Sequence, residues 1–516
     1  MTEIYDCTLR EGEQADGASF NLEDRLRIVR LLDGLGVDYI EMGWPIARQD
    51  IMESFKQAGK LELKKAKIVA FGSTSISDAV SEDKNLNSIV ESGARYACIF
   101  GKTSLSHIER QLKISAEDNL RKISESVEFL RSRGIEVFYD AEHFFDSYKD
   151  NPEYAIKTLE AAVKAGAVRI ILCDTNGGTL PEEASNMTRQ VKNSMNAEVG
   201  VHFHNDCGLA LANSLACLPY VNQIQATVNG IGERVGNTDL CELLPNLVLK
   251  LGLKMDIKLE KLKELSEEVY KAANLPEQIT QAFVSPRAFL HKGGVHIDAT
   301  LKGASYEHIN PEHLGLEHHL IFSSLGGAAC IVNTAAKFGY AVDKRKEKDK
   351  ITQLLGKLAE LESKGYDLGN TEAEQEILIE KYFGNWRDFF SVVEWNILTE
   401  EKESECYVKC SVGSDNIEKT VRVSGGPVDA VYHAIISSVR EKYDIELKIA
   451  DYKVRIARAR GAESTVRTKI EFSDGNKFEA FEAIGVNENV IASGIEAISK
   501  GLNYYIYKKL GKADSK

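Results

Sequence analysis

The sequence lacks the features of a membrane-spanning or secreted protein. Among its 516 residues, no apolar run approaches the length that crosses a bilayer. The strand-like start, Met1 to Leu9, has neither the basic segment nor the apolar stretch of a signal peptide. The nine cysteines, an odd number, include no Cys-x-x-Cys pair, which is typical of reduced thiols rather than of a disulfide framework. We therefore expect a cytoplasmic protein.

An excess of positive charge is also missing. Lys and Arg number 64 against 78 Asp and Glu, which gives a formal net charge of −14. A protein of this charge has no general attraction for nucleic acid or for anionic membrane surfaces. No nucleic-acid-binding module is visible in the sequence. We expect small-molecule partners, with no nucleic acid and no membrane among them.

The dinucleotide-binding fingerprint Gly-x-Gly-x-x-Gly is absent after the first predicted strand, and this argues against a doubly wound open sheet. Short β-rich runs that are apolar on both faces instead alternate with amphipathic stretches, as buried parallel strands and helices do. Eight such units in about 240 residues predict an α/β fold, the (β/α)8 TIM barrel. The predicted strands are Ile4–Leu9, Val37–Met42, Lys67–Phe71, Tyr96–Phe100, Glu136–Tyr139, Arg169–Cys173, Val199–Phe203 and Gln223–Val228.

The chain beyond the barrel divides further. From Lys250 to about Phe383 the pattern is mostly helical, and the charged stretch Asp343–Glu380 is expected to be a solvated connector. A Gly- and His-rich run, Phe289–Asp298, predicts a loop that approaches a site. From about Phe389, two strand-rich units, each followed by a helix, predict an α+β domain. We expect a barrel domain at 1–270, a helical linker subdomain at 271–388 and the α+β domain at 389–516.

Polar residues gather at the carboxyl ends of the predicted strands, where barrel enzymes hold their active sites. The glycine-rich run that follows the eighth strand either cradles a phosphate or only turns the chain. The strand-end residues are Arg10 and Glu11, Glu41, Glu142 and His143, Asp174 to Asn176, His202 and His204, and Asn229 to Asn237.

His202 and His204 are two residues apart on a predicted strand, so their imidazoles point to the same face. Taken alone, such a pair is more often satisfied by hydrogen bonds than bound to a metal. Glu11 ends the first strand, a close neighbour of the seventh in a closed barrel. Two nitrogens and one carboxylate leave open positions on a divalent ion, as a catalytic site does, and Mg, Mn, Co and Zn are all compatible. We predict a metal site at these three residues.

Other strand-end residues are candidates for chemistry, and some have a structural alternative. Arg10 would place a permanent cation over the metal site and stabilise an enolate or alkoxide, or it would form an ion pair with Glu41. Glu41, on a buried strand, needs such a partner or a catalytic task. Glu142 is a candidate base, while Asp174 and Thr175 would orient a substrate carboxylate or a metal-bound water.

Several stretches carry a family resemblance: Asp6–Gln14, Tyr39–Pro45, Phe71–Thr74, Phe100–Lys102, Tyr139–Asp146, Cys173–Thr179, His202–Ala210, Gly230–Asn237 and Phe289–His296, with Gly425–Ala430 and Asp451–Arg455 in the C-terminal part. Together they resemble the acyl-CoA-condensing, metallo-aldolase-like family that contains the 2-isopropylmalate, homocitrate and citramalate synthases. The resemblance covers nearly the whole chain and is nearest to the citramalate synthase branch. Many members have Thr where Cys7 stands and Asp where Glu11 stands, but homocitrate synthases also use Glu.

The resemblance implies a divalent metal ion held by Glu11, His202 and His204, with Asn237 in or near the coordination sphere. It implies acetyl-CoA as co-substrate and pyruvate as the keto acid, in a Claisen-type condensation that yields citramalate and CoA for isoleucine biosynthesis. The C-terminal domain resembles the family's allosteric, dimer-associated domain. A homodimer and feedback by isoleucine are therefore expected.

The resemblance also implies roles for residues around the metal. Arg10 would stabilise the enolate or keto oxygen, and Thr175 would bind the keto-acid carboxylate. Glu142 would take part in the proton transfer that activates acetyl-CoA. His296 and Tyr306, from the linker subdomain, would assist it and complete the active site.

Three alternatives stay open. A sibling synthase would use 2-oxoisovalerate or 2-oxoglutarate, and the sequence does not rank the residues that set keto-acid size. A metal-dependent barrel hydrolase also uses His-x-His, but such enzymes usually place the pair after the first strand. A non-catalytic amino-acid sensor on a decayed barrel is disfavoured, because the polar set at the strand ends is complete.

Overall fold

In the computed structural model, residues 2–291, 299, 306–317, 319–369, 371–458, 464–475 and 480–510 are described. The chain forms two compact units. The first comprises Met1–Phe289 and Ile309–Glu317, and the second Leu290–His308 and His318–Lys516. The three-domain division at residues 270 and 388 stays a prediction.

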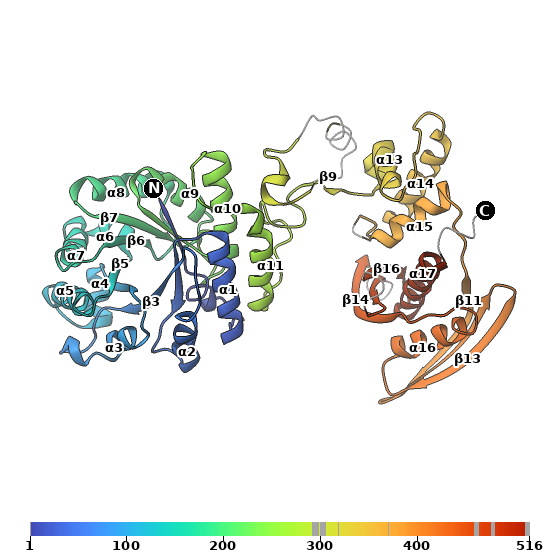
Figure 1. The fold of residues 1–516 in the computed structure, drawn as a ribbon, viewed down its shortest axis with the longest axis horizontal. Helices are drawn as coiled ribbons and strands as arrows, with labels where there is room; N and C mark the ends of the chain where they lie inside the picture. Colours follow the sequence, from blue (N-terminus) through green and yellow to red (C-terminus); the bar gives the residue numbers. More distant parts are fainter. Residues whose placement is uncertain are drawn as a thin grey trace. The chain divides into compact units, whose positions relative to one another are not determined.

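The first unit contains a closed barrel of eight parallel strands, in which β1 pairs with both β2 and β8. Its helices lie around the strands (Figure 1). This confirms the predicted TIM barrel. Strands β4 and β5 extend beyond their predicted ends, so Lys102 and Glu142 are the last residues of these strands. The strands are β1 (Glu3–Asp6), β2 (Tyr39–Gly43), β3 (Lys67–Ser73), β4 (Tyr96–Lys102), β5 (Glu136–Glu142), β6 (Arg169–Asp174), β7 (Glu198–Phe203) and β8 (Gln223–Ala226).

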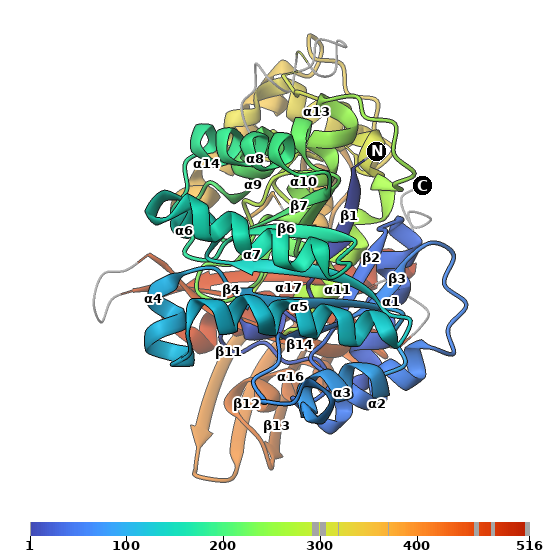
Figure 2. The same ribbon diagram turned by 90° about the vertical axis from the view of Figure 1, so that its left-hand side faces the viewer.

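Helices surround the barrel and return the chain to the start of the next strand (Figure 2). The first illustrates the local signals: Asn21 and Asp24 form a capping box at its start, and Gly36 ends it with a φ of 105°, a conformation that favours glycine. The helices are α1 (Leu22–Leu35), α2 (Gln49–Ala58), α3 (Lys84–Glu91), α4 (Leu105–His107), α5 (Ala116–Ser132), α6 (Phe144–Asp150), α7 (Pro152–Lys164), α8 (Pro181–Ser194), α9 (Ala210–Cys217), α10 (Leu240–Pro245) and α11 (Leu262–Ala272).

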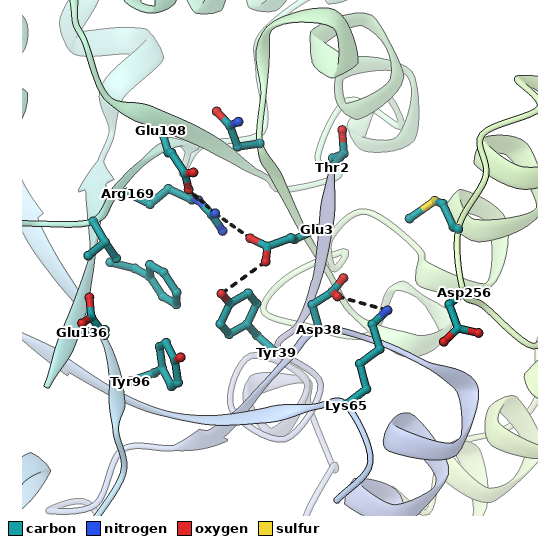
Figure 3. A pocket seen from close by; sticks show the side chains of 14 residues that line it. Thr2, Glu3, Asp38, Tyr39, Lys65, Tyr96, Glu136, Arg169, Glu198 and Asp256 are labelled. Carbon is teal, nitrogen blue, oxygen red and sulfur yellow. Dashed lines mark hydrogen bonds and ion pairs between the residues drawn. The ribbon is translucent and has the colours of Figure 1, made fainter.

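The amino-terminal end of the barrel is built for stability. Inside it, the Tyr39 and Phe138 rings pack edge to face at 5.1 Å. Beneath them Arg169 donates hydrogen bonds to Glu3 and Glu198, which ties β6 to β1 and β7 around a cavity of about 640 Å³ (Figure 3). Charged side chains at this end pair mainly with one another and so hold the strands together. In barrel enzymes the active site lies at the opposite end, where the strands have their carboxyl termini.

Among its described residues, the second unit has a short two-stranded parallel sheet, then helices α13 to α15, and then two antiparallel sheets of three strands. Each sheet packs against the helix that follows it, as the alternating burial of β12 reflects. The predicted α+β domain is confirmed, although strand β11 was not expected. The elements are β9 (Leu290–His291), β10 (His319–Leu320), α13 (Gly327–Lys337), α14 (Lys348–Lys364), α15 (Glu372–Phe383), β11 (Phe390–Thr399), β12 (Ser404–Val412), β13 (Asp415–Val423), α16 (Pro427–Val439), β14 (Lys448–Arg458), β15 (Thr465–Ser473), β16 (Phe481–Asn487) and α17 (Val490–Leu510).

Helix α15 corrects the expectation of a solvated connector. Three of its acidic residues, Glu374, Glu376 and Glu380, are 3%, 3% and 0% exposed, whereas Glu372 in its first turn is exposed. Glu376 is buried because Lys508 and the Tyr504 hydroxyl, both on α17, donate hydrogen bonds to it. The helical prediction holds for this segment, and charges on α14 such as Glu360 are exposed as expected, but these three carboxylates are buried.

All nine cysteines are free thiols, and Cys207 is exposed while the other eight are buried. Burial raises the pKa of Cys217 to about 12, so this thiol stays protonated at neutral pH. Within the described residues, no helix has both the length and the hydropathy needed to cross a bilayer.

Candidate active site

Three buried side chains converge at the carboxyl end of the barrel. Glu11 lies in the turn after β1, His202 lies in β7, and His204 follows that strand. One potential ligand atom from each lies within 4.8 Å of the other two. The residues are 2%, 5% and 6% exposed. The predicted cluster therefore comes together in space, because only β8 separates β1 from β7.

Hydrogen bonds orient the two histidines. His202 Nδ1 lies 2.9 Å from Gln225 Oε1, which accepts the Nδ1 proton and so leaves a lone pair on Nε2. Asn237 Nδ2 lies 3.2 Å from that Nε2 and 3.5 Å from His204 Nδ1. The Oδ1 atom of Asn237 and the Oε1 atom of Glu11 are buried without a hydrogen-bond partner. Imidazole nitrogens beside unsatisfied buried oxygens are a donor set that fits a divalent cation.

The protonation states of the cluster also suit a cation. Burial lowers the pKa of His202 to about 3 and holds that of His204 below its usual value. Burial by itself would raise the pKa of Glu11, but the Arg10 guanidinium brings it below its usual value. Near pH 7 the cluster offers two neutral imidazoles and one carboxylate, which are the forms that coordinate metals.

Arg10 lies beside this cluster and is held by two carboxylates. Its Nε donates to Glu41 Oε2 at 2.6 Å, and its Nη1 donates to Glu11 Oε2. Glu41 is fully buried and also accepts the Tyr5 hydroxyl at 2.6 Å. The Arg10 guanidinium lies 3.9 Å from the centre of the Phe71 ring. The ion pair with Glu41 is therefore present, and it fixes the guanidinium next to Glu11.

A second polar group lies at the ends of β4 and β5. Lys102 and Glu142 are partners in register, and Lys102 Nζ lies 2.5 Å from Glu142 Oε2. His143 Nε2 lies 3.9 Å from the other carboxylate oxygen, and the His143 backbone N–H donates to Thr175 Oγ1 at 2.8 Å. Lys102 was not among the predicted site residues, although it ends the Phe100–Lys102 motif. Its strand was predicted to end at Phe100, so the sequence did not show that Lys102 pairs in register with Glu142.

The glycine-rich run after β8 turns the chain over the cluster. Arg234 makes two hydrogen bonds to the Asp206 carboxylate, at 2.7 and 2.8 Å, and a third to the Thr175 carbonyl at 2.8 Å. These contacts join the loops that follow β6, β7 and β8. A Cβ at Gly232 would lie 2.0 Å from Asn237 Oδ1, so any larger residue there would displace the Asn237 side chain. The geometry favours the turning role over a phosphate cradle, because the guanidinium is already engaged.

A cavity of about 780 Å³ adjoins the second polar group, at the ends of β3 and β4. Lys102 and Glu142 line it, together with Trp44, Phe100 and polar side chains from the two loops. The Phe100 ring stacks on Phe71 at 5.5 Å, and Phe71 in turn lies beneath Arg10. An aromatic wall therefore connects the cavity to the cluster around Glu11.

The structure gives the surroundings of two further predicted residues, Asp174 and Tyr306, but does not describe His296. Asp174, at the end of β6, accepts the Thr179 backbone N–H at 3.1 Å, and burial raises its pKa. His296 lies outside the described residues. Tyr306 belongs to the second unit and is 57% exposed. The contribution of His296 and Tyr306 to the site stays a prediction.

Comparisons with known proteins give three matching family models along the chain. The model described as HMGL-like matches residues 1–269, the model described as homocitrate synthase post-HMGL domain-like matches residues 283–363, and the LeuA allosteric (dimerisation) domain matches residues 370–506.

Similar curated proteins extend over nearly the whole chain. An (R)-citramalate synthase of Aquifex aeolicus is 42% identical, and one of Geobacter sulfurreducens is 40% identical, each over 98% of this chain and 98% of its own. A 2-isopropylmalate synthase of Methanocaldococcus jannaschii is 30% identical over 98% of this chain and 95% of its own. The solved structure of an HMG-CoA lyase of Bacillus subtilis has a TM-score of 0.47 and 20% identity, covering 53% of this chain and 94% of that chain.

Proposed function

The chain belongs to the HMGL-like family, and from this premise we propose that it is an (R)-citramalate synthase, which condenses acetyl-CoA with pyruvate and releases CoA. It is an enzyme of the acyltransferase type. The observation that carries the proposal is the buried cluster of Glu11, His202 and His204 beside Arg10. It supplies both a cation site and a fixed positive charge where a keto acid would develop an alkoxide.

We propose that Glu11, His202 and His204 hold a divalent ion, with the unsatisfied Oδ1 of Asn237 in or near its coordination sphere. Such an ion, when bound, polarises a keto carbonyl and draws electrons from its carbon. Mg, Mn, Co and Zn are all compatible with nitrogen and oxygen ligands.

Arg10 and Thr175 are proposed to bind the keto acid. Thr175 Oγ1 already accepts the His143 N–H, so its own hydroxyl hydrogen is left to donate to the substrate carboxylate. Arg10 Nε and Nη1 are engaged by Glu41 and Glu11, which leaves Nη2 as the donor for a substrate oxygen. Glu41 would act by fixing Arg10, because it is buried beneath that side chain.

The cavity beside Glu142 is proposed to admit the acyl-CoA. Glu142 would take a proton from the acetyl methyl group: the C–H bond breaks, the proton goes to a carboxylate oxygen, and the electron pair becomes the enolate. The enolate carbon then attacks the keto carbon of pyruvate, and the electron pair of the keto C=O bond becomes an alkoxide beside Arg10 that takes up a proton. Water then cleaves the C–S bond of the thioester, which frees CoA as the thiol and leaves a carboxylate. Contact of the methyl group with this carboxylate is favoured because Glu142 lines the cavity wall.

Pyruvate is proposed over larger keto acids because two relatives named (R)-citramalate synthase are 42% and 40% identical, against 30% for a 2-isopropylmalate synthase. Phe71 and Phe100 stack beside Arg10, and Trp44 packs edge to face on both rings at 5.9 and 6.0 Å. Such an apolar wall disfavours the charged arm of 2-oxoglutarate, whereas the choice between the methyl group of pyruvate and the isopropyl group of 2-oxoisovalerate depends on the room beside it. A sibling synthase using one of these acids is the second candidate, and the 30% identity to a 2-isopropylmalate synthase favours keeping it in view.

The test is a thiol-release assay with acetyl-CoA, three keto acids and metal-depleted enzyme. We expect CoA release that requires both pyruvate and an added divalent ion, with 2-oxoisovalerate and 2-oxoglutarate at least tenfold less effective in kcat/KM. Preference for either larger acid would assign the sibling activity. Release that survives chelation, or occurs without any keto acid, would refute the condensation.

We further propose feedback by isoleucine and a homodimer, which the match to the LeuA allosteric (dimerisation) domain supports. Such an effector would lower the rate through differential affinity for two states of the enzyme. The test compares isoleucine, leucine and valine as inhibitors of the full chain, with light scattering to measure mass. Equal inhibition by all three, or none by isoleucine, would refute the effector, and a monomer would refute the dimer.

A further inference from the structure

Lys102 is a buried cation without a task in the mechanism above. The residue is 8% exposed, and its ammonium lies 2.5 Å from Glu142 Oε2. The Phe100 ring, 5.9 Å away, adds a weaker attraction. A lysine is almost never buried this deeply unless it is paired, so this charge is present for Glu142.

A purely structural ion pair does not account for the placement. Removing two charges from water costs about as much as their attraction returns, so buried pairs contribute little to stability. This pair does not lie in the barrel core. Lys102 and Glu142 are the last residues of adjacent strands, and both line the 780 Å³ cavity. The carboxylate retains 21% exposure of its side chain, as a group that meets a substrate requires.

We propose that Lys102 is a positioning residue that holds the Glu142 carboxylate aimed into the cavity, so that one of its oxygens is placed to accept the methyl proton. This inference rests on the proposed condensation. In the step itself the methyl C–H bond breaks, the proton joins a Glu142 oxygen, and the electron pair moves into the enolate of the thioester. The ammonium then faces a neutral acid, and its charge is left to balance the negative charge of the enolate in the same cavity.

The charges around Glu142 leave this role to Lys102. His143 faces the other carboxylate oxygen at 3.9 Å, but burial lowers its pKa and leaves it neutral near pH 7. Behind it lie the His107 ring, 4.3 Å from the His143 ring, and the Asp146 carboxylate. On β5 and β6, Tyr139 and Cys173 act on Glu142 only if ionised, and burial raises the pKa of both. Among the described residues, Lys102 is the cation paired with Glu142.

The experiment measures kcat and the KM for acetyl-CoA separately for Lys102→Met, Lys102→Arg, Glu142→Gln and the double variant Lys102→Met/Glu142→Gln. Loss of the ammonium leaves the carboxylate free to turn from the reacting methyl group, so K102M should lower kcat about 100-fold while the KM for acetyl-CoA changes less than about threefold. K102R keeps the charge and the hydrogen-bond donors and restores most of kcat. The double variant is no slower than E142Q, because Lys102 acts through that carboxylate.

Two controls separate this role from a structural one. Lys157→Met removes an ammonium from an exposed ion pair on α7 and should leave kcat and KM unchanged. Binding of Mn²⁺ and the unfolding temperature should change little in K102M. An unchanged kcat in K102M, equal losses in K102R and K102M, or additive losses in the double variant would each overturn the proposal. Should the wild type prefer another keto acid, the proposed substrate fails, but the same four variants still test Lys102 with that acid.

Discussion

Buried carboxylates occur in both units, and their surroundings differ. In the barrel, Glu11 is 2% exposed, and its Oε1 has no hydrogen-bond partner. In the second unit, Glu376 is 3% exposed, and both of its oxygens accept from Lys508, at 3.0 and 2.8 Å, while the Tyr504 hydroxyl donates at 2.7 Å. One acid is left incomplete and the other is fully satisfied.

The difference distinguishes a ligand-binding site from a structural contact between two helices. A buried oxygen without a partner costs free energy, and it persists where a ligand completes it or where function requires it. A satisfied acid fixes two elements to one another, as Glu376 fixes α15 to α17. Burial and charge therefore do not by themselves identify a catalytic group, whereas an unsatisfied ligand atom among other ligand atoms does point to one.

The largest expected effect comes from breaking the incomplete cluster. His202→Ala should lower kcat/KM for CoA release at least about 1,000-fold and abolish Mn²⁺ binding measured by calorimetry, because a ligand is lost. The unfolding temperature should change little. His433→Ala is the matched control, since His433 is half exposed on α16. Full Mn²⁺ affinity in the His202 variant would contradict the metal site.

Removal of Glu376, whose two oxygens both have hydrogen-bond partners, should instead lower the stability of the fold. Glu376→Ala removes three charge-assisted hydrogen bonds and is expected to lower the free energy of unfolding by about 2 kcal/mol. The partial exposure of Lys508 limits the loss. Glu360→Ala, on the solvent side of α14, should leave unfolding unchanged. Calorimetry measures the unfolding temperature and enthalpy of both variants. Equal unfolding transitions in the two would show that Glu376 does not stabilise the packing of α15 on α17.

A smaller effect is expected one layer behind the cluster. Gln225 Oε1 accepts the His202 Nδ1 proton, so Gln225→Leu leaves the imidazole free to rotate and to change tautomer. Mn²⁺ affinity should fall about tenfold, with the ligands themselves intact. Gln190→Leu, at an exposed position of α8, is the control. An unchanged dissociation constant would mean that packing alone orients His202.

The last expected effect appears only when the pH changes, and it concerns Asp239, an acid without a cationic partner among the described residues. Burial raises the pKa of Asp239 to about 7, well above its unfolded value near 4. Between these values the folded state binds more protons, so the stabilisation present at low pH is lost as the pH rises through 7. Asp239→Asn should remove this dependence, changing the slope of unfolding free energy by at most about 1.4 kcal/mol per pH unit between pH 4 and 7. Urea titrations at several pH values measure the slope, and an unaltered slope would show that Asp239 is ionised throughout.

Much of the barrel and its cluster was predictable. The alternation of apolar runs with amphipathic stretches predicted eight strands, and strand ends in a closed barrel must meet, so Glu11, His202 and His204 were expected together. The pairing of Lys102 with Glu142 was not, because it depends on strand register and on two strands running past their expected ends. The burial of helix α15 was not predicted for a related reason: a charged helix is expected to face water unless its partners are known, and here they lie 128 and 132 residues later in the chain.

The sequence by itself determined the types and order of the elements and the chemical nature of the ligands, because apolar periodicity and side-chain identity are local properties. Only the tertiary structure decided which charges meet. Arg10 pairs with Glu41 across 31 residues, and Lys508 with Glu376 across 132. Such contacts follow from strand register and helix packing, which no spacing along the chain specifies. These contacts distinguish Glu11, which keeps an oxygen without a hydrogen-bond partner, from Glu376, whose oxygens both have partners.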